Sequence, residues 1–272
     1  MTDYYGADLV APTKSKVRTN GIEIAYIERG SGDPLVLIMG LGADLSAWEL
    51  HLRAYAEQFR CIAVDNRGAG DSDKPEGPYT TAGMADDYAG LIRSLGLGKV
   101  RVVGISMGGA IAQELAIRHP ELVERMVLVS SWARTATFTR EVFEEFKNLR
   151  SILTEAEFAR LLQLRIWTPE YVENHIDELS AAREVPSTVP HHAFEAQSAA
   201  CLGHDTIGRM ASLRVPTLIT VGGADAFTPL VRSEELRGQI PAAELKIFPG
   251  SGHAHHWEEL EEFNRYTMEW LK

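Results

Sequence analysis

Residues 104–108 of this 272-residue chain place a serine between two glycines, in the order Gly-Ile-Ser-Met-Gly. An apolar run typical of a strand, Val100 to Val103, precedes this stretch, and a run typical of a helix follows it. A sharp turn between strand and helix forces its central residue into a strained backbone, and the flanking glycines let the two elements pass closely. The pattern predicts that the Ser106 hydroxyl projects from the carboxyl edge of a sheet as a nucleophile.

A serine hydroxyl is a weak nucleophile unless a base within reach takes its proton, and the base needs a group to orient it. In a parallel sheet such groups come from loops at the carboxyl ends of strands. Of the nine histidines, His253 lies on a short glycine-rich loop directly after an expected strand, so we predict that it is the base. His255 and His256 are near enough to compete, although their place at the start of the last helix suits helix capping or pocket lining.

The orienting acid must also follow a strand. Asp225 comes four residues after Val221, on a Gly-Gly turn, whereas the loop after the expected strand at 123–129 offers no carboxylate. We therefore predict that Asp225 orients the base; the alternative is an aspartate that only shapes its turn. The chain order Ser106, Asp225, His253 is the one expected for a serine nucleophile on this kind of sheet.

Attack on a carbonyl places negative charge on its oxygen, so the site also needs N–H donors. The backbone N–H of Met107, directly after the nucleophile, is one candidate. The other is the N–H of Leu41, in the loop after the expected strand at 34–39. Because Gly40 and Gly42 let that backbone come close, we predict that Leu41 and Met107 form the oxyanion hole.

The elements that must position these groups are strands that alternate with helices. This alternation indicates βαβ units and a parallel sheet, and Asn20-Gly21 predicts a hairpin at an antiparallel edge. The expected strands cover residues 16–19, 22–29, 34–39, 59–64, 99–103, 123–129, 216–221 and 244–248. The expected helices between and after them cover residues 46–58, 81–95, 106–118, 230–238 and 258–271.

The alternation stops near Trp132 and resumes at Pro216. Between them the sequence is helical and amphipathic, and it is too long for a loop in a compact domain. We predict an α/β core made of residues 1–134 and 211–272, with residues 135–210 inserted as a helical cap. Residues 1 to 14 are expected to be a loose lead-in.

The charge of the chain argues against several partners. Its formal net charge is −11 at pH 7, whereas nucleic-acid and anionic-membrane surfaces call for basic side chains. Cys61 and Cys201 are too few for a disulfide framework and are expected to be reduced. Neither a basic and apolar leader nor a run of roughly 20 apolar residues is visible. We expect a cytoplasmic protein that acts on a small molecule.

Five motifs, in this order, resemble those of the α/β-hydrolase superfamily, and they span nearly the whole chain. They are Met39–Gly42, Asp65–Ser72, Gly104–Gly109, Gly222–Asp225 and Gly252-His253. Within the superfamily the chain is similar to the small capped group of enol-lactonases, acyl-homoserine-lactone and ester hydrolases, and cofactor-free haloperoxidases. The resemblance implies an eight-stranded, mostly parallel sheet with a helical cap after the sixth strand.

One position departs from the resemblance. Many members carry histidine before the first glycine of the oxyanion loop, where this chain has Met39. That side chain is not an oxyanion donor, so we expect catalysis to survive above a more apolar pocket floor. The turn from Asp65 to Arg67 is expected to brace the loops near the site.

The residues and the resemblance together imply a serine hydrolase that cleaves a carboxylic ester or lactone through an acyl-enzyme. No metal or organic cofactor is expected, because no carboxylate or cysteine pattern completes a site around His191 and His192. Trp132, Trp167 and Phe227 are candidates for lining an apolar substrate pocket, with ordinary core packing as the alternative.

Other functions remain open. The same triad could hydrolyse a C–C bond or a thioester, or form a peracid, although Ile105 is not the polar neighbour that C–C hydrolases carry beside the serine. A ligand receptor would keep the triad while a bound signal reshapes the cap for a protein partner.

Overall fold

The computed structural model describes residues 14–241 and 243–272, so the expected lead-in lies outside the described residues except for Lys14. This part of the chain forms an eight-stranded sheet with the order β1-β2-β4-β3-β5-β6-β7-β8. The strands are β1 (Ser15–Thr19), β2 (Ile22–Arg29), β3 (Asp33–Ile38), β4 (Phe59–Val64), β5 (Val100–Ile105), β6 (Val123–Val129), β7 (Thr217–Gly222) and β8 (Glu244–Phe248). β2 pairs antiparallel with β1 and β4, and every other neighbouring pair is parallel, which confirms the predicted mostly parallel sheet.

Two features of the sequence fix this sheet. Asn20 and Gly21 adopt φ angles of 47° and 83°, the positive values that a two-residue hairpin turn requires, and they join β1 to β2. Every residue of β5 and of β7 is buried, as in strands covered by helices on both faces. Because these central strands are parallel, the loops that follow them meet at one edge of the sheet.

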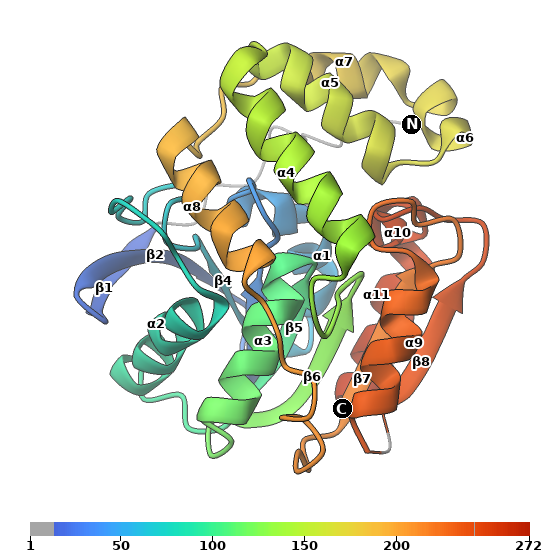
Figure 1. The fold of residues 1–272 in the computed structure, drawn as a ribbon. Coiled ribbons are helices and arrows are strands. Elements are labelled where there is room, and N and C mark those ends of the chain that lie inside the picture. Colours follow the sequence, from blue (N-terminus) through green and yellow to red (C-terminus); the bar gives the residue numbers. More distant parts are fainter. Residues whose placement is uncertain (1–13, 242) are drawn as a thin grey trace.

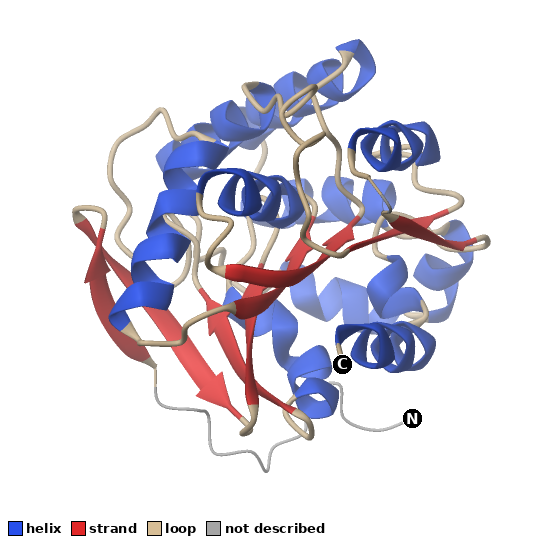
Figure 2. Cartoon of the chain, turned by 90° about the horizontal axis from the view of Figure 1, so that it is seen from below, coloured by secondary structure: helices blue, strands red, loops and turns tan. Residues whose placement is uncertain are grey.

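Helices cover both faces of the sheet (Figures 1 and 2). Alternate residues of β3 enter different cores: Leu35 and Leu37 pack with α1 (Glu49–Tyr55) and α11 (Leu260–Leu271). The opposite core combines the intervening strand residues with side chains from three further helices. These are α2 (Thr81–Ser94), α3 (Met107–Arg118) and α9 (Leu230–Gln239).

Two helices expected to be continuous are divided. The first begins as a 3-10 turn, η1 (Leu45–Trp48), whose N-terminal amide at Ser46 donates to the Asp44 carboxylate, and continues as α1. The last, expected over residues 258–271, is observed as α11, because the non-helical backbone of Glu259 divides it from Glu258, which ends the short helix α10 (His255–Glu258). In the first helix the apolar spacing of Trp48, Leu52 and Tyr55 runs across the junction, which explains why periodicity alone predicts a single helix.

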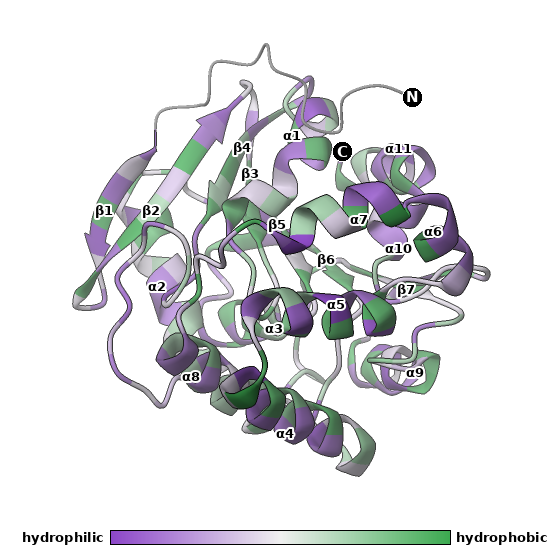
Figure 3. Cartoon of the chain, turned by 90° about the horizontal axis from the view of Figure 1, so that it is seen from above, coloured by the Kyte–Doolittle hydropathy of each residue, from purple (hydrophilic) through white to green (hydrophobic). Residues whose placement is uncertain are grey.

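The segment between β6 and β7 forms helices that lie over the carboxyl edge of the sheet (Figure 1). They are α4 (Thr137–Ile152), α5 (Glu155–Ile166), α6 (Pro169–Asn174), α7 (Ile176–Arg183) and α8 (His191–Leu202), here named the cap helices. Each cap helix mixes hydrophilic and hydrophobic residues (Figure 3). The buried residues of α4 include Phe143 and Phe146. The division into a core and a cap remains a prediction. Among the helices described, none is long and apolar enough to cross a bilayer.

Candidate active site

Ser106 occupies the sharp turn between β5 and α3. Its backbone has φ 54° and ψ −116°, a conformation that is costly for a residue with a side chain. The neighbouring glycines permit it, because a Cβ atom at Gly104 would collide with the backbone of Gly108. The Ser131 hydroxyl donates to the Ser106 carbonyl at 3.0 Å and holds the turn. The local sequence thus places the hydroxyl at the N-terminus of α3, where the helix dipole favours negative charge.

His253 and Asp225 meet at the same edge of the sheet, on the loops after β8 and β7. His253 Nδ1 lies 2.9 Å from Asp225 Oδ2, and both side chains are buried. With Nδ1 donating to the carboxylate, Nε2 is the ring nitrogen that can accept a proton from a serine. Among the residues described, no hydrogen bond joins Ser106 Oγ to His253, whose Nδ1 contacts are Asp225 and Thr228. Such bonds commonly tighten only when substrate binds.

The Asp225 carboxylate is fully engaged. Its Oδ1 accepts the backbone N–H groups of Phe227 and Thr228, each at 2.8 Å, and its Oδ2 accepts the Thr228 hydroxyl at 2.8 Å. Burial alone would raise the pKa of Asp225. The charge and hydrogen bond of His253 and the two hydrogen bonds from Thr228 outweigh this effect and hold the pKa below its usual value. Asp225 thus shapes its own turn and also contacts His253, and its role as the orienting acid stays a prediction.

Two hydroxyl groups near His253 were not predicted. Thr228 Oγ1 lies 3.1 Å from His253 Nδ1, and the Ser130 hydroxyl donates to the His253 carbonyl at 2.8 Å. Thr228 Oγ1 also lies 3.1 Å from the Ser130 carbonyl oxygen, which competes with Asp225 Oδ2 for the one hydroxyl proton, and this contact brings the loops after β6 and β7 together. The sequence offered one signal for these contacts, which was the position of Ser130 directly after an expected strand.

The expected oxyanion loop lies against the nucleophile. A Cβ atom at Gly40 would be 3.3 Å from the Ser106 Cβ, and Leu41 follows Gly40, while Met107 begins α3. Within residues 14–241 and 243–272, neither the Leu41 nor the Met107 amide donates to a protein acceptor. Two uncommitted N–H groups near a serine hydroxyl suit the charge that develops on a carbonyl oxygen.

A family model described as the alpha/beta hydrolase fold matches residues 33–260. The chain belongs to this family. A relative from Serratia proteamaculans (strain 568), named "Putative carbamate hydrolase RutD", is 30% identical over 243 residues, which cover 87% of this chain and 90% of the relative.

Solved structures that resemble this chain are also hydrolases. An enol-lactonase from Burkholderia xenovorans LB400 has a TM-score of 0.87 at 26% identity, covering 94% of this chain and 99% of the other. A thermophilic esterase from Thermogutta terrifontis, solved with malate, has a TM-score of 0.85 at 27% identity, covering 95% and 98%. The predicted resemblance to small α/β-hydrolases is confirmed.

The two alternative histidines have other surroundings in this α/β-hydrolase. His255 is fully buried, with Nδ1 3.2 Å from the Ser130 hydroxyl and Nε2 3.0 Å from that of Thr220. His256 Nδ1 lies 3.0 Å from His51 Nε2, also in the interior. Neither side chain caps α10 or α11, so the expected capping role is wrong. Both rings are held by the core, and burial lowers the pKa of each.

The turn from Asp65 to Arg67 braces neighbouring loops. Asp65 accepts the backbone N–H groups of Leu45 and Asp71, each at 2.8 Å, and Arg67 forms two hydrogen bonds of 2.6 Å with Asp87. These contacts fix the segments after β3 and β4.

A chain of phenylalanine rings connects the oxyanion loop to His253. The Phe194 ring lies 3.0 Å from where a Cβ atom of Gly42 would be, and the Phe227 ring meets the His253 ring edge-on with centroids 4.8 Å apart. The rings follow one another at centroid distances of 5.2, 6.0 and 5.2 Å, in the order Phe194, Phe158, Phe146 and Phe227. We name these four residues the phenylalanine arch. Three of these residues come from the cap helices α4, α5 and α8. The sequence did not indicate that they lie near the site, because helical spacing does not tell which face of a helix meets it.

Of the three residues predicted to line the pocket, one contacts the candidate base and the other two contact other residues. Phe227 touches His253, whereas Trp132 is fully buried beside Phe143 and donates its indole N–H to Thr135. Trp167 is half-buried and stacks on Tyr171, with ring centroids 4.2 Å apart. Their role toward substrate stays a prediction.

Met39 is 4% exposed and packs with the α1 and α11 core. It therefore contributes to the layer behind the sheet, and the expected apolar pocket floor at this position is wrong.

Glu258 links a cap loop to the histidine loop. One carboxylate oxygen accepts the N–H of Thr168 at 2.7 Å, and the other accepts the N–H of Gly252 at 2.8 Å. The N–H of Ala254 adds a bond of 3.0 Å to the Ile166 carbonyl. The turn between α5 and α6 thus supports the backbone on both sides of His253.

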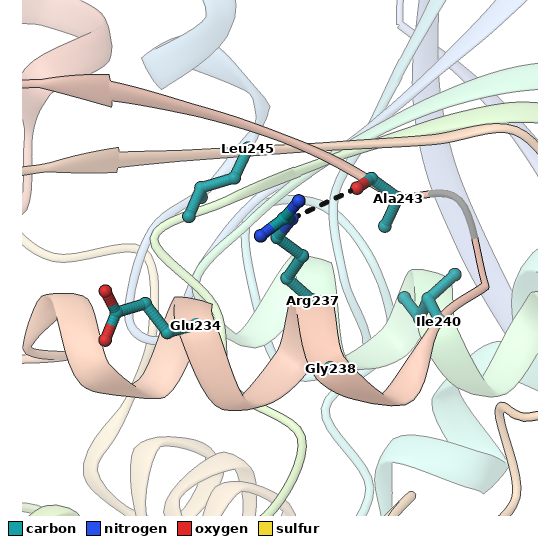
Figure 4. A pocket seen from close by; sticks show the side chains of 6 residues that line it. All are labelled: Glu234, Arg237, Gly238, Ile240, Ala243 and Leu245. Atoms are coloured by element: carbon teal, nitrogen blue, oxygen red, sulfur yellow. Dashed lines mark hydrogen bonds between the residues drawn. The ribbon is translucent and has the colours of Figure 1, made fainter.

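A hollow of about 390 Å³ lies elsewhere, between α9 and β8 (Figure 4). It is lined by Glu234, Arg237, Gly238, Ile240, Ala243 and Leu245. This is the amino end of β8, opposite the edge that carries Ser106, so the hollow has no part in the chemistry described here. In the described chain, no three His, Cys, Asp or Glu side chains gather as a metal site.

Proposed function

We propose that this α/β-hydrolase cleaves a carboxylic ester or lactone through an acyl-enzyme on Ser106. The observation that carries the proposal is the buried Asp225–His253 pair at the same sheet edge as a strained serine. The uncommitted amides of Leu41 and Met107 support the same chemistry.

In the proposed reaction the Ser106 oxygen attacks the carbonyl carbon while His253 Nε2 takes its proton. The tetrahedral oxyanion accepts hydrogen bonds from Leu41 and Met107, and Asp225 stabilises the imidazolium. Collapse breaks the ester C–O bond, and His253 gives its proton to the leaving oxygen. A water molecule, deprotonated by His253, then attacks the acyl-enzyme and releases the acid and the free serine.

The phenylalanine arch favours an uncharged substrate with an apolar acyl part. Its four rings are between 1% and 6% exposed, and Ser106 is 5% exposed, so the substrate meets an enclosed, aromatic surface. A lactone fits this description because it is compact and uncharged. The similarity to an enol-lactonase supports the same choice.

Carbamate hydrolysis is the second candidate. The relative from Serratia proteamaculans bears that name and aligns with 87% of this chain. A small carbamate would also fit an enclosed site, and the same serine would attack its carbonyl. Release of ammonia from carbamate, at a rate above that of lactone opening, would favour this function.

Covalent labelling tests the proposal directly. A fluorophosphonate should modify the wild-type chain stoichiometrically, and peptide mapping should place the label on Ser106, because phosphonylation requires an activated serine. The Ser106→Ala chain should remain unlabelled. A wild-type chain that is neither labelled nor able to hydrolyse p-nitrophenyl acetate, butyrate or any lactone of a panel would refute the proposal.

Replacing Phe146 with leucine should widen the range of acyl chains. Phe146 stacks on Phe227, which touches His253, so a smaller side chain opens space beside Phe227 and lets this ring move away from the base. We expect the ratio of kcat/KM for p-nitrophenyl octanoate to that for the acetate to rise about tenfold. Phe263→Leu, a buried change in the core behind the sheet, is the control and should leave the ratio unchanged. An equal ratio in all three chains would remove the phenylalanine arch from substrate selection.

A further inference from the structure

Gln197 joins a cap helix to two loops of the core. It lies on α8, and its side chain is completely buried. Its Oε1 accepts the backbone N–H of Gly42 at 3.1 Å, and its Nε2 donates to the Arg67 carbonyl at 2.9 Å. One buried amide therefore satisfies a donor and an acceptor on segments that precede it by more than 100 residues.

The loop that receives this contact is the expected oxyanion loop. Gly42 directly follows Leu41 and has a φ of 75°, and glycine adopts positive and negative φ about equally readily, so the residue itself does little to hold one orientation. The neighbouring amide of Leu41 has no protein acceptor within the described chain. The hydrogen bond from Gly42 to the Gln197 side chain thus restrains the peptide between Leu41 and Gly42, next to the proposed donor, the Leu41 N–H.

The other end of Gln197 rests on a rigid support. The Arg67 guanidinium is fixed by Asp87 through two bonds of 2.6 Å and lies over the Tyr79 ring. The α8 backbone is also close to this segment, since the Ala196 carbonyl accepts the Tyr79 N–H at 3.3 Å. The position of Gln197 is therefore tied to the core segment that carries Arg67 and Tyr79, through its side chain and through the α8 backbone.

We propose that Gln197 is a positioning residue of the oxyanion hole: it holds Gly42 so that the Leu41 N–H points at the developing oxyanion. This inference rests on the proposed acyl-transfer function. It makes α8 part of the catalytic scaffold, because removal of the glutamine leaves the half-buried N–H of Gly42 without its protein acceptor and frees the loop to turn away. Positioning of this kind acts on the transition state more than on substrate binding.

Gln197→Met tests the proposal, since methionine fills similar space without either hydrogen bond. We expect kcat for p-nitrophenyl butyrate to fall about 10- to 100-fold, with KM changed by less than about twofold. The inhibition constant of an alkyl boronic acid, which forms a tetrahedral adduct with serine, should rise by the same factor as kcat/KM falls.

Gln163→Met is the matched control. Gln163 is also a buried glutamine on a cap helix, with Nε2 donating to Leu179 at 2.9 Å and Oε1 accepting from Arg183 at 2.6 Å, but both partners lie in the cap helices. The same substitution there should leave kcat within about twofold of wild type. An equal loss in both variants, a change in KM alone, or full activity of Gln197→Met would overturn the proposal.

Amide hydrogen exchange separates this proposal from the proposed function. The Gly42 amide should exchange about tenfold faster in Gln197→Met than in wild type, whereas Gln197→Glu, which keeps an acceptor, should retain most of the protection. This result does not depend on finding a substrate. Unchanged exchange at Gly42 would overturn the positioning role even in an active enzyme, and faster exchange in a chain without esterase activity would refute only the proposed function.

Discussion

Replacing Asp225 with asparagine should lower kcat for ester hydrolysis by about four orders of magnitude. The cause is a forced orientation of the new amide. Oδ1 of Asp225 accepts two backbone N–H groups, so the asparagine oxygen must take this place and its NH₂ group must face His253. The NH₂ group then donates to Nδ1, which places the histidine proton on Nε2. Nε2 can no longer accept the proton of Ser106.

The measurement is kcat across the pH range, together with the histidine tautomer from ¹⁵N chemical shifts. Asp73→Asn is a suitable control, because Asp73 also accepts a backbone N–H, from Glu23 at 2.9 Å, but lies in a loop beside the hairpin. It should keep the wild-type rate. If Asp225→Asn retained more than about a tenth of the activity, Asp225 would be a turn residue and not the orienting acid.

The sheet and the chemistry-bearing loops could be predicted from the sequence for one physical reason. Buried parallel strands are continuous apolar runs, and their carboxyl ends meet at one edge. Once those runs are recognised, the polar residues that follow them are few, and Ser106, Asp225 and His253 stand out. The structure brings Asp225 and His253 into hydrogen-bond contact and places Ser106 on the same edge.

The supports of these residues could not be predicted, since they depend on contacts between distant segments. Gln197 and Gly42 are 155 residues apart, and Glu258 reaches Thr168 across 90 residues. A buried glutamine on an amphipathic helix has no spacing that reveals its partner. Periodicity indicated the cap helices, but not that α8 contacts the oxyanion loop or that α5 reaches the histidine loop.

Lowering the pH from about 6.5 toward 5 should destabilise the protein steeply, because several histidines are buried in the neutral form. They are His51, His204, His255 and His256. Burial lowers the pKa of His51 and His204 to about 4 and that of His255 to about 3. The pKa of His256 lies well below its usual value, because burial and the nearby His51 both disfavour its charge.

The direction of the change in the free energy of unfolding depends on whether the folded or the unfolded state binds protons first as the pH falls. A histidine in the unfolded chain titrates near about pH 6.5, so above this pH both states are neutral and the stabilisation is fully present. Below it the unfolded state gains protons that the folded state does not, until the folded pKa is reached. Each buried histidine then removes up to about 1.4 kcal/mol per pH unit, and four together remove up to about 6 kcal/mol per pH unit. This is comparable to the whole free energy of unfolding of a typical domain, about 5–15 kcal/mol.

Urea denaturation at several pH values between about 7.5 and 5 measures the effect; most carboxylates titrate below this window. His204→Gln should reduce the pH slope by about a quarter. The glutamine amide can still bond to Thr81 and Gln113, which contact the ring in the wild type. His191→Gln, a change of an exposed histidine on α8, should leave the slope unaltered. A free energy of unfolding that stays constant down to about pH 5 would mean that these histidines accept protons inside the fold, which the enclosed His51–His256 contact of 3.0 Å disfavours.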